Sequence, residues 1–156
     1  MLATLTETYF SDPAWVYERK LDGERVLTFV ERGKPHLYSR NRIELNGNYP
    51  ELVEAFERMN AKNLVVDGEV VASDGTFASL QRRMQTRNAE DARRSGVRIT
   101  YHVFDLLSVG GRDVRALPLL ERKALLRSSV AFLSRRRPRK RGWRSLPSRV
   151  HSVKPI

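Results

Sequence analysis

The nine-residue segment 64–72 (LVVDGEVVA) constrains the fold of this chain more than any other stretch. Its valines occupy both alternating sets of positions, and this pattern predicts a strand that is buried on both faces. The turn sequence 73–76 (SDGT) follows and ends the strand. A strand buried in this way belongs inside a hydrophobic core, and a chain of 156 residues is long enough to build one.

Further strands and helices are predicted on both sides of this segment. Alternating or continuous apolar runs predict strands, and apolar residues spaced by three and four positions predict helices. Helices are predicted from about residue 48, over most of 77–95, and from 118 to about 133, the last with Leu119, Leu120, Ala124, Leu125 and Val130 on its buried side. The other strands are predicted at 14–20, 26–31, 36–40 and 99–107. Strands and helices mixed in this order predict an α+β domain.

The positive charge of the chain is concentrated near its C-terminal end. The formal net charge is +11, but residues 134–156 contain nine Lys and Arg residues and no acidic residue. Residues 1–133 therefore contain 20 basic and 18 acidic residues, a net charge of +2. We expect a folded domain over 1–133 and a disordered basic tail over 134–156. The abrupt change of composition favours a frameshift product over a basic arm that contacts phosphates.

Composition also excludes several classes of protein. The chain contains no cysteine, so it has neither disulfides nor a thiolate metal site. Its first residues lack the basic start and apolar run of a signal peptide, and no apolar stretch approaches the length of a membrane span. We expect a soluble, cytoplasmic protein that does not associate with membranes.

A lysine in the segment 15–25 (WVYERKLDGER) is a candidate nucleophile. The alternation of apolar and polar side chains predicts a strand that the Asp22-Gly23 turn ends. Lys20 then lies at the strand end, with Glu18 on the same face. If it is partly desolvated or close to other cations, its amine can attack phosphorus. The alternative is a solvated lysine beside a surface turn.

Four ordered motifs resemble those of the covalent nucleotidyltransferases, which include ATP-dependent DNA ligases and mRNA capping enzymes. They are motif I with Glu18 and Lys20, motif Ia at 39–41 (SRN), motif III at 64–71 and motif IIIa at 101–107 (YHVFDLL). Connecting segments such as 80–84 (LQRRM) and 119–126 (LLERKALL) resemble most closely the ligase module of bacterial end-joining DNA ligases. The resemblance implies the N-terminal part of an ATP-grasp-like adenylation domain, with mixed or antiparallel sheets and flanking helices.

The resemblance also implies a reaction and a set of roles. Lys20 would attack the α-phosphorus of ATP, AMP would pass to the 5′-phosphate of nicked double-stranded DNA, and the 3′-hydroxyl would displace AMP, in DNA repair or recombination. Glu18 would accept a hydrogen bond from the adenine amino group, because a carboxylate is only an acceptor. Arg25 and Arg40 would hold sugar or phosphate, for which the planar guanidinium is suited. End-joining repair proteins are possible partners.

Motifs III and IIIa would complete the nucleotide site. Glu69 would lie near the ribose and the Mg²⁺ or Mn²⁺ ion, and Phe104 would stack on adenine, with Tyr101 as the second choice. Asp67 would be a structural acid. These roles require an adenine-sized cleft between Lys20 and the strands that carry Glu69 and Phe104.

The family pattern extends beyond what this sequence contains. Motifs IV, V and VI and the OB-fold domain are absent, so we expect impaired activity, because cations placed around the phosphates provide most of the catalysis of phosphoryl transfer. Two alternatives remain open at this point. One is another enzyme of the superfamily, an RNA ligase or capping type, and the other is a non-catalytic DNA- or partner-binding fragment.

Overall fold

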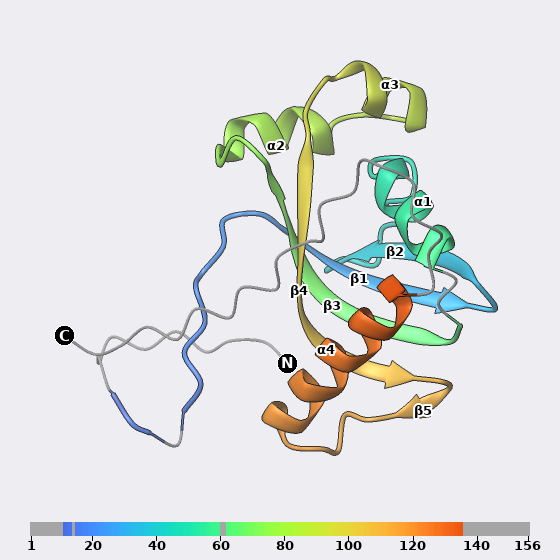
Figure 1. Ribbon diagram of the computed structural model, residues 1–156. Coiled ribbons are helices and arrows are strands. Elements are labelled where there is room, and N and C mark those ends of the chain that lie inside the picture. The colour runs from blue at the N-terminus through green and yellow to red at the C-terminus, as the bar shows by residue number, and fades with distance from the viewer. Residues whose placement is uncertain (1–10, 14, 60–61, 136–156) are drawn as a thin grey trace.

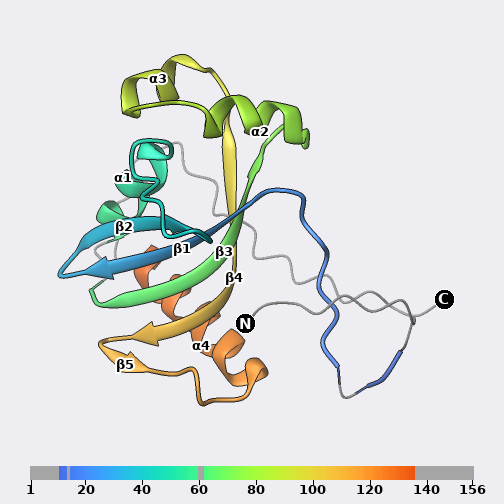
Figure 2. The ribbon, with the colours of Figure 1, turned by 180° about the vertical axis from the view of Figure 1, so that it is seen from behind.

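One five-stranded antiparallel sheet organises the chain, with the strand order β2-β1-β3-β4-β5. The computed structural model describes residues 11–13, 15–59 and 62–135. In chain order, the elements are β1 (Glu24–Glu31), β2 (Lys34–Ser39), α1 (Pro50–Met59), β3 (Leu64–Ala72), α2 (Phe77–Met84), α3 (Ala89–Arg94), β4 (Ile99–Val109), β5 (Arg112–Asp113) and α4 (Leu119–Arg135). Figure 1 shows α1 and α4 on one side of this sheet, and Figure 2 shows the sheet from its other side.

Strand β3 is central because both of its edges are paired. It pairs with β1 on one side and with β4 on the other. Val66 and Val70 point to the buried face and are almost fully covered, whereas Asp67 and Glu69 point to the opposite face. The acidic residues of motif III are therefore presented on the side of the sheet away from α1 and α4.

The core lies between the sheet and the helices that cover it. Side chains from β1, α1 and α4 meet those of β3, as represented by Val26, Phe56 and Leu126. Helix starts are capped locally, since Thr76 accepts a hydrogen bond from the Ser79 amide (3.3 Å) at α2.

Most of the predicted elements are confirmed, including the α+β class. The predicted strand 64–72 has the predicted bounds, and the strand predicted at 99–107 extends to residue 109. The helix predicted from about residue 48 begins at Pro50, and the helical stretch predicted over 77–95 forms two helices, of which the second is capped by Asn88.

Two predictions about local structure are wrong. Residues 15–20 are not a strand; their side chains are exposed, and β1 begins only at Glu24. In α4, Lys123 and Leu126 are buried, whereas Leu120 is 65% exposed. The buried side predicted for this helix is therefore only partly right: Leu125 packs against the core, but Lys123 occupies a position that faces the sheet. Ala124 is likewise exposed, and the Val130 side chain lies outside the described part of the structure.

Of the predicted tail, only its first two residues belong to the described ranges, as the end of α4. No helix within the described ranges combines the length and the apolar character that crossing a membrane requires.

Candidate nucleotide-binding site

The turn of motif I lies directly against motif III. A Cβ atom on Gly23 would stand 2.2 Å from the carbonyl oxygen of Val70 and 2.9 Å from Cγ of Glu69. Only glycine lets the two backbones approach this closely. The Gly23 amide also donates a hydrogen bond to the Glu69 carboxylate. The Asp-Gly of motif I therefore joins the segment that carries Lys20 to the central strand.

An ion pair links β1 and β3 beside this turn. Nε of Arg25 donates to Oδ1 of Asp67 (3.1 Å) and Nη2 donates to Oδ2 (2.5 Å), a two-point contact between the planar guanidinium and the carboxylate. The Asp67 side chain is only 7% exposed. The guanidinium also lies over the ring of Phe104, 5.9 Å from its centroid. Asp67 is thus a structural acid, as predicted, and it orients the arginine of motif I.

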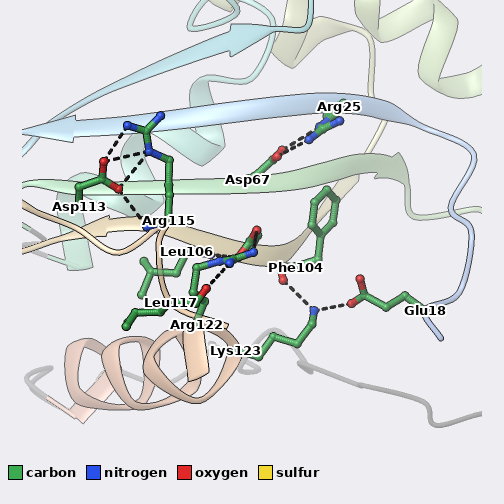
Figure 3. Close-up of polar contacts among 11 residues, drawn as sticks. Glu18, Arg25, Asp67, Phe104, Leu106, Asp113, Arg115, Leu117, Arg122 and Lys123 are labelled. Atoms are coloured by element: carbon green, nitrogen blue, oxygen red, sulfur yellow. Dashed lines mark hydrogen bonds and ion pairs between the residues drawn. The ribbon is translucent and has the colours of Figure 1, made fainter. Parts of the chain in front are cut away.

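A second ion pair crosses from motif I to α4. Nζ of Lys123 donates to Oε1 of Glu18 (2.5 Å) and to the carbonyl oxygen of Phe104 (2.9 Å). Figure 3 shows the Phe104 ring between this contact and the Arg25–Asp67 pair. Three of the predicted residues, Glu18, Arg25 and Phe104, are therefore brought together.

Glu69 lies in an environment that disfavours its charge. Burial, the largest effect, raises the pKa of the Glu69 carboxyl, while the Gly23 amide and the positive charges of Arg25 and Lys20 oppose that change. The positive charge of Lys20 is the smallest of these influences on Glu69. A half-buried carboxylate facing two cations is suited to contact a sugar hydroxyl or a hydrated metal ion.

The position of Lys20 differs from the sequence prediction. Its side chain is exposed, in the loop before β1 and not at the end of a strand. Burial therefore does not desolvate the amine in this structure. Arg25 and Lys20 both act electrostatically on Glu69.

Arg40 is presented by a tight turn after β2. Two main-chain hydrogen bonds close this turn: the Arg42 amide donates to the Ser39 carbonyl oxygen (2.9 Å), and the Ser39 amide donates to the Ile43 carbonyl oxygen (2.9 Å). The Ser39 hydroxyl also accepts a bond from the Ile43 amide (3.1 Å). The serine of motif Ia therefore shapes the turn, and Arg40 is left exposed.

A groove of about 500 Å³ lies on the same face of the sheet. Its lining includes Arg25, Arg40 and Asp67 but not Lys20, Glu69 or Phe104; the remaining lining residues are Leu27, Phe29, Tyr38, Ser39, Arg42 and Leu107. This groove lies on the side of the motif Ia turn, and it is not the cleft that was expected between Lys20 and the strands that carry Glu69 and Phe104.

Tyr101, the second choice for adenine stacking, is a core residue and is not available. Its side chain is 3% exposed, and its hydroxyl donates to the carbonyl oxygen of Val26 (2.7 Å). The ring packs against Gly68, where an added Cβ would stand 2.5 Å from it. The glycine of motif III is therefore required for packing between β3 and β4.

Sequence reasoning missed the contribution of α4 to this region. Arg122 forms a two-point ion pair with Asp105 (both 2.9 Å), and Lys123 reaches Glu18 and Phe104. The available signal was Lys123, which stands one turn before Leu126 in α4, because a lysine at a core-facing position requires a partner.

Comparison with known proteins agrees with this geometry. The family model for the ATP dependent DNA ligase domain matches residues 1–148. The DNA ligase of Cenarchaeum symbiosum is 36% identical over 119 residues, covering 72% of this chain and 20% of the relative. The DNA ligase of Methanococcus aeolicus is 28% identical over 131 residues, covering 81% of this chain and 23% of the relative. The chain therefore belongs to the ATP-dependent DNA ligase domain family, and it spans about a fifth of the length of these relatives.

Solved structures support the fold and the resemblance to end-joining ligases. The ligase domain of M. tuberculosis LigD superposes with a TM-score of 0.59 at 27% identity, covering 72% of this chain and 36% of that domain. A mycobacterial DNA ligase D complexed with ATP and MES superposes with a TM-score of 0.57 at 28% identity, covering 70% and 34%. The predicted fold class, part of a ligase adenylation domain with an antiparallel sheet, is confirmed.

Proposed function

We propose that this chain provides the nucleophile and the adenosine-binding part of an ATP-dependent DNA ligase, which seals nicks in double-stranded DNA through a lysyl-AMP intermediate. The observation that carries the proposal is the convergence of Glu18, Lys20, Arg25, Glu69 and Phe104 at the start of β1, in a chain of the ligase family. This family membership favours DNA ligation over the RNA ligase or capping alternative.

The first chemical step uses the amine of Lys20. Its nitrogen forms a bond to the α-phosphorus of ATP, the bond to the bridging oxygen breaks, and pyrophosphate leaves, while the amine loses a proton. Lys20 attacks as the neutral amine and its proton passes to water, so positive charge near the α-phosphate would come from Arg25. Arg40, exposed on the groove, is suited to phosphates of the nucleotide or of the nicked strand.

The adenine would be held by two groups. Glu18 accepts a hydrogen bond from its amino group, because an ionised carboxylate cannot donate one. The Phe104 ring provides a stacking surface, one that the Arg25 guanidinium already approaches. The purine would then lie between the motif I segment and β4.

Magnesium fits the site through Glu69. The described residues contain no group of three acidic or histidine side chains of the kind that encloses a metal ion. Mg²⁺ keeps several of its waters and needs only one or two carboxylates together with nucleotide phosphates. Glu69, or Asp67 through water, would hold it, and the ion would neutralise charge on the phosphates.

Labelling with ATP tests the proposal. The purified chain is incubated with Mg²⁺ and ATP that is radiolabelled at the α-phosphate, and the site of label is identified by mass spectrometry. We expect weak, acid-labile label on Lys20 and none in the Lys20→Ala variant, with Lys62→Ala as the control. Label that persists in Lys20→Ala, or ATP affinity that Glu18→Ala and Phe104→Ala leave unchanged, would contradict the assigned roles.

The partner and location follow from the substrate. Nicked DNA is the partner in this proposal, with end-joining repair proteins as further partners suggested by the likeness to ligase D. We place the protein in the cytoplasm, with the DNA on which it would act. Binding assays that compare the affinity for nicked and intact duplexes of the same sequence test the preference for nicks.

A further inference from the structure

Among the described residues, Lys123 is a buried amine that none of the roles above uses. Its side chain is 6% exposed on α4, between the helix and β4, and its two oxygen partners are Oε1 of Glu18 and the carbonyl oxygen of Phe104. Figure 3 shows the Lys123 ammonium between these two partners, one on β4 and one on the segment before β1. A lysine buried in this way is costly unless it is paired, so the site is built around the contact.

We propose that Lys123 is a positioning residue that holds Glu18, and with it the segment that carries Lys20, in the geometry needed for adenine selection and attack. The inference rests on the proposed function for the nucleotide, but the anchoring itself is a property of the ligand-free protein.

The contact determines how Glu18 can read a base. Lys123 occupies Oε1 of the carboxylate, so Oε2 is left to accept a hydrogen bond. The second bond of Lys123, to the Phe104 carbonyl, ties that carboxylate to the backbone of the residue proposed to stack on the base. The Lys123 ammonium group therefore holds both residues proposed to contact the adenine: Glu18 at its edge and Phe104 at its face.

The contact also limits where Lys20 can be. Residues 15–20 are exposed and form no strand, so sheet pairing does not hold them. Two contacts flank Lys20 on this part of the chain: the ion pair of Glu18 with Lys123, and the hydrogen bond of the Gly23 amide to Glu69. Loss of the first would release the segment that carries the nucleophile from α4.

The first measurement needs no nucleotide. Limited trypsin digestion, followed by mass spectrometry, gives the rate of cleavage after Arg19 and Lys20 in the full chain. Replacing Lys123 with Met is expected to accelerate this cleavage about tenfold, which is the effect of losing a charge-assisted bond to a half-exposed partner. The conservative variant Lys123→Arg should restore most of the protection. Arg127→Met, an exposed change on the same helix, is the matched control.

The second measurement reports base selection. We expect Lys123→Met to lower the ratio of ATP to GTP affinity about tenfold, because Glu18 no longer faces the adenine amino group. Equal losses of affinity for both nucleotides, together with cleavage as slow as in Arg127→Met, would overturn the proposal.

Two further controls keep the result interpretable. If Lys123→Met does not fold by circular dichroism, Glu18→Gln removes the same ion pair from its exposed side and should accelerate cleavage equally; unchanged cleavage in that variant would also overturn the proposal. If the parent chain binds neither ATP nor GTP, the proposed function fails, while the digestion experiment still decides whether Lys123 anchors the segment.

Discussion

Replacing Gly23 with Ala should separate the motif I turn from the central strand. The new Cβ would stand 2.2 Å from the Val70 carbonyl oxygen, whereas ordinary contact begins at 3.4 Å. Because β3 is paired along both edges, the strand cannot yield and the turn must move, by roughly 1 Å. The added methyl group is expected to cost about 1–3 kcal/mol, of which the lower chain entropy of the unfolded alanine variant offsets about 0.4–1 kcal/mol.

The expected net loss is therefore about 1–2 kcal/mol of unfolding free energy, a fall in Tm of roughly 2–8 °C. Thermal unfolding followed by circular dichroism measures it, with Gly47→Ala as the matched control, since a Cβ there would meet its nearest atom at an ordinary 3.5 Å. A displacement of about 1 Å should also reduce formation of lysyl-AMP about 100-fold. If Gly23→Ala had the same Tm as Gly47→Ala and formed lysyl-AMP at the parental rate, the close approach of motifs I and III would be needed neither for stability nor for attack by Lys20.

Three other predictions concern charged groups. Replacing Arg83, which is 3% exposed and donates to two main-chain carbonyls and a carboxylate, with Met should lower the unfolding free energy by about 3 kcal/mol; a loss below about 1 kcal/mol in urea titrations would contradict this. Replacing Arg25 with Met should cost about 2 kcal/mol by the same assay, less than the 3–5 kcal/mol typical of a fully buried pair, because Asp67 loses a partner that is itself 30% exposed. Burial raises the pKa of Glu69 above its ordinary value of 4.5, so its stabilising contribution is present at lower pH and is lost as pH rises through the raised pKa. Replacing Glu69 with Gln should therefore raise the Tm at pH 7 more than at pH 4, while weakening the affinity for Mg²⁺ and ATP.

Much of this protein follows from local sequence patterns. The valine-rich segment 64–72 predicts a buried strand because β-branched residues on both faces can be accommodated only between covering layers. Asn88 marks a helix start because its side chain accepts a hydrogen bond from a free amide of the first turn, and Pro50 marks one because proline has no amide hydrogen to leave unpaired. The order of the motifs was sufficient to indicate the ligase family, with Glu18, Lys20 and Glu69 as its polar groups.

The contacts between these segments depended on the tertiary structure. Glu18 is paired with Lys123, which is 105 residues away in sequence, and no spacing rule relates them. Which of Phe104 and Tyr101 is buried in the core depended on the register of β4 against β3, because a shift of one residue reverses the face of every side chain. The exposure of residues 15–20 depended on the absence of a strand partner, which an alternating pattern alone cannot reveal. Sequence thus determined which groups the site contains, and packing across the sheet decided which of them meet, because long-range contacts are set by the burial of the whole core and not by local preference.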